Sequence, residues 1–223
     1  MSTLLELKQI TLNYKNYNTS VEVIKGIDLK INSSEKVAVV GKSGSGKTSL
    51  IMLMAGLEQP TSGDIIFDQQ LISNFNEDQL ADLRKKKIGI VFQSFYLIPN
   101  YTALENVSLI LEINNIDNSK QKAEDLLVQF GLKDRLHHFP TQLSGGEQQR
   151  VAIARSMAVK PKLILADEPT GNLDSENSQM ISNLLFEYAN KNQSSFVLVT
   201  HDLKFAEKCD RIIQIEDGNI VSS

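Results

Sequence analysis

Apolar and polar residues alternate in two stretches near the start of the chain, Leu5–Leu12 and Ile27–Ile31. Alternation with a period of two predicts strands that bury one face and expose the other. The stretch between them, residues 13–20, is mostly polar and predicts a turn that carries Tyr14 and Tyr17. The chain is therefore expected to begin with a short antiparallel β segment.

Further along the chain, apolar runs bounded by turn residues have the length of buried strands. These runs are Lys36–Val40, Ile65–Phe67, Ile88–Phe92, Leu163–Asp167, Ser195–Thr200 and Arg211–Ile215. Stretches with helical character lie between them, at Ser49–Ala55, Glu77–Lys87, Ala103–Ile113, Lys120–Gly131, Gly145–Ala158, Ser175–Lys191 and Leu203–Lys208. Wholly apolar strands that alternate with helices predict a parallel sheet covered on both faces, which is an α/β fold.

The strand–helix alternation is interrupted between residues 94 and 159, where amphipathic helices follow one another. We expect one domain with three parts: a mainly antiparallel β part at residues 1–35, a core formed by residues 36–93 and 160–223, and an inserted helical subdomain at residues 94–159. The length of 223 residues suits a single α/β domain that carries such an insertion.

One glycine-rich loop, Gly41–Thr48, follows the expected strand Lys36–Val40 and opens into the next helix. A strand, a glycine-rich loop and a helix in this order predict a phosphate-binding P-loop. Glycines let successive backbone N–H groups turn toward a di- or triphosphate, and the helix N-terminus favours the same anion. We expect Lys47 to reach the β- and γ-phosphates and Thr48 to bind the accompanying Mg²⁺.

Polar side chains also end several other expected strands. Asp167 and Glu168 close one strand, and Gln93 and His201 follow two others. In an open α/β sheet the ligand binds outside the carboxyl ends of the strands, which is where the P-loop lies. Asp167 suits the Mg²⁺ position, and Glu168 is placed to polarise the water that attacks the γ-phosphorus. Gln93 would contact Mg²⁺ or that water, and His201 the γ-phosphate.

A second anion-binding stretch, Leu143–Arg150, begins a predicted helix far along the chain from the P-loop. Ser144 and Glu147 form a capping box, and Gly145 and Gly146 expose their N–H groups at the helix N-terminus. A single nucleotide could not easily bridge both loops within one monomer. A head-to-tail C2 dimer resolves this, because each ATP then lies between one P-loop and the partner's Ser-Gly-Gly loop.

Composition and charge narrow the class of protein and its cellular location. Apolar residues make up 41% of the chain, enough for a sizeable core, and the net charge of −4 argues against a nucleic-acid coat protein. The single cysteine fits a reducing compartment. No apolar run approaches the ~18–20 residues that span a bilayer, and no signal peptide is visible. We expect a cytoplasmic protein that reaches the membrane through a partner.

These motifs follow the order found in ATP-binding cassette (ABC) transporters, and the chain resembles their nucleotide-binding subunit over essentially its whole length. The matching residues are Walker A Gly41–Thr48, the Q-loop residue Gln93, the signature Leu143–Arg150, Walker B Leu163–Asp167 with Glu168, the D-loop Gly171–Asp174 and the switch histidine His201. The resemblance implies a P-loop NTPase (RecA-like) core, ATP hydrolysis with Mg²⁺, and stacking of Tyr14 on adenine.

The resemblance implies a large site, in which every residue contacts either the nucleotide or its metal ion. Catalytic roles fall to Glu168, His201, Gln93 and Lys47. Mg²⁺ would be held by Thr48, Gln93 and Asp167. ATP would contact Tyr14, Gly41, Ser43, Gly44, Ser45, Gly46, Lys47, Thr48, Ser49, Ser144, Gly145, Gly146 and Asp174, the signature residues coming from the other protomer.

Within the family, residues 166–174 and 102–107 look like the LolD/MacB/FtsE group, and residues 91–99 with 209–211 are closest to YbbA-type cassettes. This implies a membrane partner with few spans and a large extracytoplasmic domain, acting in lipoprotein release, efflux or cell-wall remodelling. Segment 94–106 would dock the partner's coupling helix, on the cytoplasmic face of the inner membrane.

Two positions depart from the common family pattern. Ser34-Glu35 stands where most members have Gly-Glu, which affects a turn. Gly171-Asn172 stands in the D-loop where many cassettes have Ser-Ala, and this is a feature of the subgroup that the chain resembles.

Three other classes share parts of the motif set. DNA-repair and chromosome ATPases insert a long coiled coil, but this chain has no sustained heptads and no basic stripe. Translation-associated ABC proteins need two cassettes in one chain. A regulatory module that barely hydrolyses ATP is disfavoured by the intact Glu168 and His201.

Overall fold

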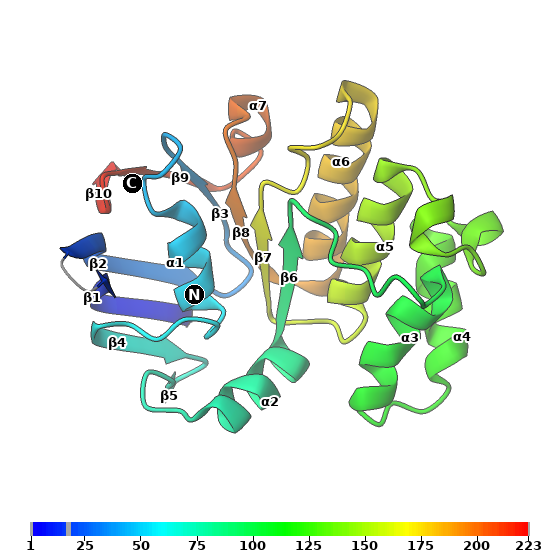
Figure 1. Ribbon diagram of the computed structural model, residues 1–223, viewed down its shortest axis with the longest axis horizontal. Helices are drawn as coiled ribbons and strands as arrows, with labels where there is room; N and C mark the ends of the chain where they lie inside the picture. Colours follow the sequence, from blue (N-terminus) through cyan, green and yellow to red (C-terminus); the bar gives the residue numbers. More distant parts are fainter. Residues whose placement is uncertain (1, 17–18, 223) are drawn as a thin grey trace. The chain divides into compact units, whose positions relative to one another are not determined.

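The computed structural model describes residues 2–16 and 19–222, in which ten strands and seven α-helices follow one another (Figure 1). The strands are β1 (Thr3–Asn16), β2 (Thr19–Asn32), β3 (Lys36–Val40), β4 (Ser62–Phe67), β5 (Gln70–Leu71), β6 (Ile88–Phe92), β7 (Leu163–Asp167), β8 (Ser195–Val199), β9 (Arg211–Glu216) and β10 (Asn219–Ser222). The α-helices are α1 (Lys47–Met54), α2 (Glu77–Lys87), α3 (Ala103–Ile113), α4 (Ser119–Gln129), α5 (Gly145–Met157), α6 (Ser175–Asn192) and α7 (Leu203–Ala206). Two 3-10 helices span Lys133–Arg135 and Pro140–Gln142.

Contacts between residues divide the chain into two compact units. The first contains the residues up to 84, residues 165–167 and those from 195 onward. The second contains residues 85–164 and 168–194. The three-part organisation expected from the sequence remains a prediction.

The antiparallel sheet of the first unit has the strand order β2-β1-β4-β5. Alternation in β1 buries Leu5 and Leu7 on the face that the sequence pattern indicated. Strand β4 pairs with β1 and β5 pairs with β4, so residues 62–71 extend this sheet beyond residue 35.

The turn expected over residues 13–20 is wrong, because β1 and β2 both continue into this stretch. Tyr14 pairs with Val21 across the two strands. Aromatic and β-branched residues that face each other stabilise a strand pair, which polar composition alone does not reveal. Tyr17 lies outside the described residues.

The second sheet of the first unit contains β10, β9, β3 and β8 in that order, followed by β7, whose last three residues belong to this unit. Strands β9, β3 and β8 run parallel, and β10 pairs antiparallel with β9. The side chains of β8 are buried throughout, which accounts for its continuous apolar sequence. Parallel strands bring their carboxyl ends to one edge, where β3 leads into Gly41 and β8 into Thr200.

In the second unit, α3 packs on α4 and on α5, while α5 also packs on β6 and α6 (Figure 1). Helices α3 and α5 both begin with a reciprocal capping box, at Thr102 with Glu105 and at Ser144 with Glu147. Strong caps of this kind explain why the starts of α3 and α5 could be predicted from the sequence.

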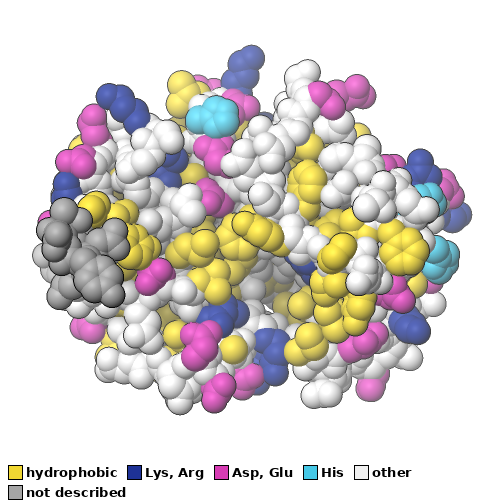
Figure 2. All heavy atoms as spheres, in the orientation of Figure 1, with side chains coloured by type: hydrophobic (Ala, Val, Ile, Leu, Met, Phe, Trp, Pro, Cys, Tyr) yellow, Lys and Arg dark blue, Asp and Glu magenta, His cyan; other side chains and the backbone are white. Residues whose placement is uncertain are grey.

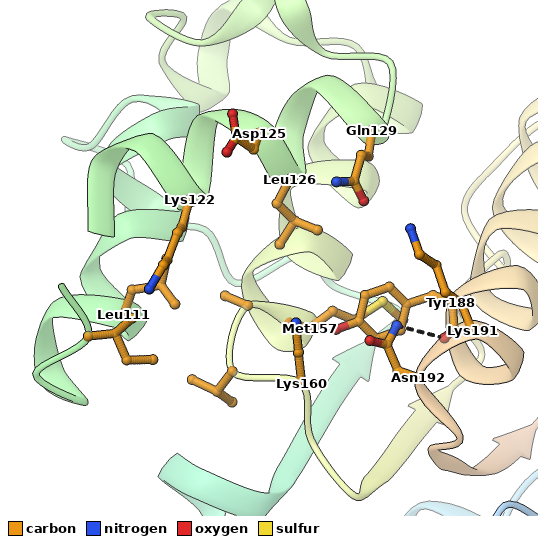
Figure 3. A pocket seen from close by; sticks show the side chains of 13 residues that line it. Leu111, Lys122, Asp125, Leu126, Gln129, Met157, Lys160, Tyr188, Lys191 and Asn192 are labelled. Carbon is orange, nitrogen blue, oxygen red and sulfur yellow. Dashed lines mark hydrogen bonds between the residues drawn. The ribbon is translucent and has the colours of Figure 1, made fainter. Parts of the chain in front are cut away.

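A pocket of about 430 Å³ also lies in the second unit (Figure 3). Side chains from α3, α4, α5 and α6 line it, among them Leu111, Leu126, Met157 and Tyr188. None of the motif residues predicted from the sequence belongs to its lining. The chemistry expected from the motifs must therefore be sought elsewhere.

Basic and acidic side chains are interspersed on the face of each unit seen in Figure 2, in keeping with the modest net charge of −4. Within the part of the chain that the structure describes, no helix combines the length and the apolar character needed to cross a bilayer.

Truncation of a core aromatic residue tests the fold. Phe196 in β8 is fully buried, so Phe196→Ala is expected to lower the free energy of unfolding by about 3–5 kcal/mol, measured by urea denaturation. Val128 on α4 is 43% exposed, and Val128→Ala should change stability by less than about 0.5 kcal/mol. A loss below about 1 kcal/mol for Phe196→Ala would contradict the burial described here.

Candidate functional site

The glycine-rich loop connects β3 to α1 and packs tightly against its neighbours. Gly46 precedes α1 with a φ of +100°, and a Cβ there would lie 2.9 Å from the carbonyl oxygen of Val23. At Gly41, with a φ of +157°, a Cβ would lie 2.2 Å from the carbonyl oxygen of Ile215. Gly46 offers no side chain to cap α1, so its first backbone N–H groups are available to an anion.

Two polar groups of this loop, the Lys47 ammonium and the Ser45 hydroxyl, are suited to bind an oxyanion. The Lys47 ammonium donates to the carbonyl oxygens of Gly41 at 2.9 Å and Lys42 at 2.8 Å, so it is folded back onto its own loop. The Ser45 hydroxyl is buried and has no hydrogen-bond partner among the described residues. Phosphate oxygens would satisfy both groups.

Thr48 and Asp167 are 119 residues apart in sequence but meet in the first unit. The Thr48 hydroxyl donates to Asp167 Oδ2 at 2.8 Å, and the Asp167 side chain is nearly buried at the end of β7. A hydroxyl and a carboxylate are the hard oxygen ligands that Mg²⁺ prefers. No group of three or more His, Cys, Asp or Glu side chains that could hold a metal occurs in the described ranges. Mg²⁺ is often bound by one or two carboxylates together with phosphate oxygens, so the pair fits this ion.

Tyr14 lies on β1 rather than in a turn, with its side chain 46% exposed. Its hydroxyl donates to Glu58 Oε2 at 3.3 Å. Partial burial, followed by the Glu58 carboxylate, raises the pKa of Tyr14, while a hydrogen bond with Ser49 acts in the opposite direction. The fold therefore brings the expected adenine-stacking residue to the first turn of α1, where Ser49 lies.

His201 follows β8 and is exposed. The Thr200 amide donates to the carbonyl oxygen of Val39 at 3.3 Å, which ties the end of β8 to the strand that leads into the P-loop. Asp202 then caps α7 by accepting from the Lys204 amide at 2.9 Å. These bonds fix the backbone on both sides of His201.

In the second unit, Gln93 follows β6 and its side chain is exposed. Gln93 Nε2 donates to Asn172 Oδ1 at 3.1 Å, and Asn172 Nδ2 donates to the backbone oxygen of Gln93 at 3.2 Å. In the sequence, Asn172 stands out only as a departure from the common D-loop. Its contact was missed because 79 residues separate the two partners and no local pattern signals it.

Glu168 adopts a backbone conformation that is uncommon for its residue type. Its φ is +47°, and the left-handed region costs a residue with a Cβ roughly 1 kcal/mol. The turn that holds it is closed by the Gly171 amide, which donates to the Glu168 carbonyl oxygen at 3.0 Å. Such strain, directly after a buried strand that ends in Asp167, is typical of functional positions.

The predicted capping box at the start of α5 is present. The Ser144 amide donates to Glu147 Oε2 at 2.8 Å, and Arg135 Nε donates to Glu147 Oε1 at 2.8 Å. The Ser144 amide first, and Arg135 in addition, lower the pKa of Glu147 against the opposing effect of burial. The helix N-terminus that carries Gly145 and Gly146 is thus held in place by an ionised carboxylate.

The D-loop and the signature glycines lie against each other in the second unit. A Cβ on Gly146 would lie 2.4 Å from Asn177 Oδ1, which explains glycine at this position. Asn177 Nδ2 in turn donates to Asp174 Oδ2 at 2.7 Å. Asn177 was not predicted from the sequence, because an asparagine in the first turn of a helix is common.

Helix α5 carries two further side chains that the sequence analysis passed over. Gln149 is fully buried and donates to the carbonyl directly before Gln93 at 3.3 Å and to the carbonyl directly after Glu168 at 2.6 Å. Arg155 donates to the carbonyls of residues 95–96 at 3.1 and 2.6 Å, and burial lowers its pKa. The signature helix therefore fixes both sides of Gln93 and the turn after Glu168.

Comparison with known proteins agrees with these motifs. The family described as ABC transporter matches residues 24–171. The lipoprotein-releasing system ATP-binding protein LolD of Idiomarina loihiensis is 43% identical over 217 residues, covering 96% of this chain and 95% of the relative. The macrolide export ATP-binding/permease protein MacB of Pasteurella multocida is 44% identical over 98% of this chain, which matches 34% of that longer protein.

A solved structure of an ATP-binding cassette also matches the fold of this chain. The dimeric ATP-binding cassette MJ0796, in a post-hydrolysis state bound to ADP and Pi, has a TM-score of 0.92 and 38% identity, covering 98% of this chain and 97% of that one. The chain belongs to the ABC transporter family, as an ATP-binding cassette of the LolD/MacB group. The predicted P-loop NTPase fold and ATPase class are confirmed.

Neutralising the carboxylate of the capping box should weaken the second unit in a pH-dependent way. Glu147→Gln keeps an acceptor for the Ser144 amide but loses the charge that faces Arg135, whose side chain is partly screened by solvent. We expect a loss of about 0.5–1 kcal/mol at pH 7, measured by thermal unfolding. Because the folded pKa of Glu147 is lowered, this contribution is present above the unfolded value and is lost as the pH falls through the folded pKa. If the unmodified chain remained more stable than Glu147→Gln below the folded pKa of Glu147, this assignment to the Glu147 charge would be wrong.

Proposed function

We propose that this chain is the ATP-hydrolysing subunit of a transporter of the LolCDE or MacB type, in which closure of an ATP-bound homodimer drives a membrane partner. The observation that carries the proposal is the 2.8 Å hydrogen bond between Thr48 and Asp167. It joins the P-loop to the end of a buried strand at the position where a nucleotide and its metal ion bind in this class of fold.

The residues of the P-loop and those that lie near its nucleotide each have a proposed role in binding a triphosphate. Lys47 would exchange its two loop carbonyls for β- and γ-phosphate oxygens, and Ser45 would donate its buried hydroxyl. Thr48 and Asp167, with Gln93, would hold Mg²⁺, which when bound neutralises charge on the phosphates. The half-exposed ring of Tyr14 supports its assignment as the surface on which adenine stacks.

Glu168 would act as the general base. A carboxylate accepts a proton from water as the water attacks the γ-phosphorus. The strained backbone of Glu168, held by the turn to Gly171, supports this role because it fixes the direction of the side chain. His201 would hydrogen-bond the γ-phosphate, and Gln93 would position the water or the metal ion.

The signature loop would complete the site of a second protomer. Ser144, Gly145 and Gly146 form an anion-binding helix start, and Asp174 lies next to it through Asn177. In a head-to-tail dimer these residues would stabilise the charge that develops during phosphoryl transfer on the partner's ATP. The dimeric form of the related cassette MJ0796, bound to ADP and Pi, supports a dimer as the active assembly.

Removing the proton acceptor separates binding from turnover. Glu168→Gln preserves shape but its amide cannot accept a proton, so we expect ATP affinity within about threefold of the unmodified chain, an ATP-stabilised dimer, and at least a hundredfold loss of hydrolysis. Equilibrium binding, light scattering with ATP and phosphate release measure the three quantities. The exposed Glu187 on α6 supplies the matched control, Glu187→Gln, which should behave as the unmodified chain. Normal hydrolysis by Glu168→Gln would remove Glu168 from this role.

Segment 94–106 would receive the coupling helix of the membrane partner. Tyr96 is 67% exposed with a φ of +46°, and Tyr101 is 38% exposed. Two side chains hold the backbone of the segment: the half-buried Arg155 through the carbonyls of residues 95–96, and the buried Asn106 through the amide of Ile98 at 2.8 Å and neighbouring carbonyls. Exposed aromatic side chains on a rigid backbone are typical of a docking surface.

The partner is proposed to have few membrane spans and a large extracytoplasmic domain, and to hold this chain on the cytoplasmic face of the inner membrane. The names of the relatives, a lipoprotein-releasing system ATP-binding protein and a macrolide export ATP-binding/permease protein, support a permease as the partner. The small number of spans and the large extracytoplasmic domain follow from the resemblance to the LolD/MacB/FtsE group. Lipoprotein release, efflux and mechanotransmission are the activities that such a partner would perform.

Affinity purification from detergent-solubilised native membranes, followed by mass spectrometry, tests the partner and the docking segment together. We expect a protein with about four membrane spans to be recovered, and Tyr96→Asp with Tyr101→Asp to reduce its recovery at least about tenfold, because buried aromatic contacts dominate interfaces. The control Val128→Asp alters another exposed apolar residue of the second unit. Recovery of a many-span permease would contradict the partner class, and unchanged recovery would contradict the segment.

A further inference from the structure

The D-loop departure Gly171-Asn172 has a structural counterpart in the Q-loop residue. Asn172 exchanges two hydrogen bonds with Gln93, one from each side-chain amide. Both residues belong to the second unit, so this contact lies within one compact part of the chain.

The direction of these bonds determines how the Gln93 amide is turned. The backbone oxygen of Gln93 can only accept, so Asn172 must present Nδ2 to it. The other end of the same amide, Oδ1, then faces the Gln93 side chain and can only accept from Nε2. Gln93 Oε1 therefore points away from Asn172, and in the described part of the chain it accepts no hydrogen bond.

Gly171 makes room for this arrangement. A Cβ at that position would lie 2.9 Å from Gln93 Nε2 and 3.3 Å from Gln93 Cδ. A side chain there would therefore displace the Gln93 amide from Asn172. The two D-loop residues serve one geometry: Gly171 leaves room for the Gln93 side chain, and Asn172 binds it.

We propose that Asn172 is a positioning residue that orients Gln93 so that its amide oxygen, and not its nitrogen, is presented to the Mg²⁺ of the bound nucleotide. This inference rests on the proposed function, in which Gln93 is a ligand of that ion. Mg²⁺ binds oxygen and is repelled by an N–H donor, so an amide turned the wrong way is no ligand. A residue that hydrogen-bonds a metal-ligating side chain orients that ligand, and mutation of such a residue commonly lowers metal affinity.

The effect should appear in the metal requirement rather than in stability. Gln93 and Asn172 are both exposed, so their hydrogen bonds add little to folding. Loss of Asn172 frees the Gln93 amide to rotate, which reduces the fraction of molecules with the oxygen toward the ion. We expect about a five- to tenfold rise in the Mg²⁺ concentration needed for half-maximal effect.

The test titrates Mg²⁺ against binding of a fluorescent ATP analogue to the full chain carrying Glu168→Gln, so that hydrolysis does not contribute. Asn172→Ala should raise the half-maximal Mg²⁺ concentration about five- to tenfold and leave metal-free nucleotide binding and Tm unchanged. Gly171→Ala should act in the same way, because its φ lies outside the left-handed region and the added Cβ alone disturbs Gln93.

The double variant Gln93→Ala with Asn172→Ala decides whether Asn172 acts through Gln93. We expect it to match Gln93→Ala alone, since a positioning residue has no effect once its target is absent. Asn183→Ala is the matched control, because Asn183 accepts from Gln179 Nε2 at 2.9 Å in an exposed amide pair on α6, away from the motifs.

Two results would overturn the inference, and they are distinguishable. If Gln93→Ala raises the Mg²⁺ requirement and Asn172→Ala does not, or if the two effects simply add, Asn172 does not position Gln93. If Gln93→Ala leaves the Mg²⁺ requirement unchanged, the role of Gln93 in the proposed function fails, and the role of Asn172 fails with it.

Discussion

The hydrogen bond between Thr48 and Asp167 joins the P-loop after β3 to the end of β7, and the parallel pairing of β3 with β8 and β9 sets the sheet edge at which the P-loop lies. Parallel strands deliver their carboxyl ends to one edge, so polar residues that follow buried apolar strands meet there whatever their separation in sequence. Burial of β8 on both faces keeps this edge rigid. In the first unit the sheet itself therefore performs most of the positioning of the P-loop and Asp167.

In the second unit, helix α5 has a comparable organising role. Its N-terminus presents the signature glycines, while Gln149 and Arg155 on the same helix bind the backbone around Gln93 and after Glu168. Buried amide and guanidinium groups that are bonded to backbone carbonyls are costly to leave unpaired. A displacement of α5 must therefore carry the Q-loop and the turn after Glu168 with it, so that three motifs move as one body.

Most elements were predictable from sequence because their signals are local. Apolar runs mark β3, β6 and β7, and the capping boxes at Thr102 and Ser144 mark helix starts. The β1–β2 hairpin was underestimated because cross-strand pairing of Tyr14 with Val21 outweighs polar composition. The motif residues were found through their order along the chain. Their supporting contacts were not, since Gln149 and Asn172 act through partners that only the folded chain brings close.

The segment that follows Gln93 is held by its backbone. Arg155 and Asn106 bind carbonyl and amide groups of residues 95–102, and these groups are the same whatever side chains the segment carries. Arg155 and Asn106 therefore determine the backbone shape of this surface, while exposed side chains such as Tyr96 and Tyr101 determine its chemistry. In the proposed complex, substitutions at Tyr96 or Tyr101 would change which membrane protein is recognised while the backbone held by Arg155 and Asn106 stays the same. One cassette architecture would then serve unrelated cargoes.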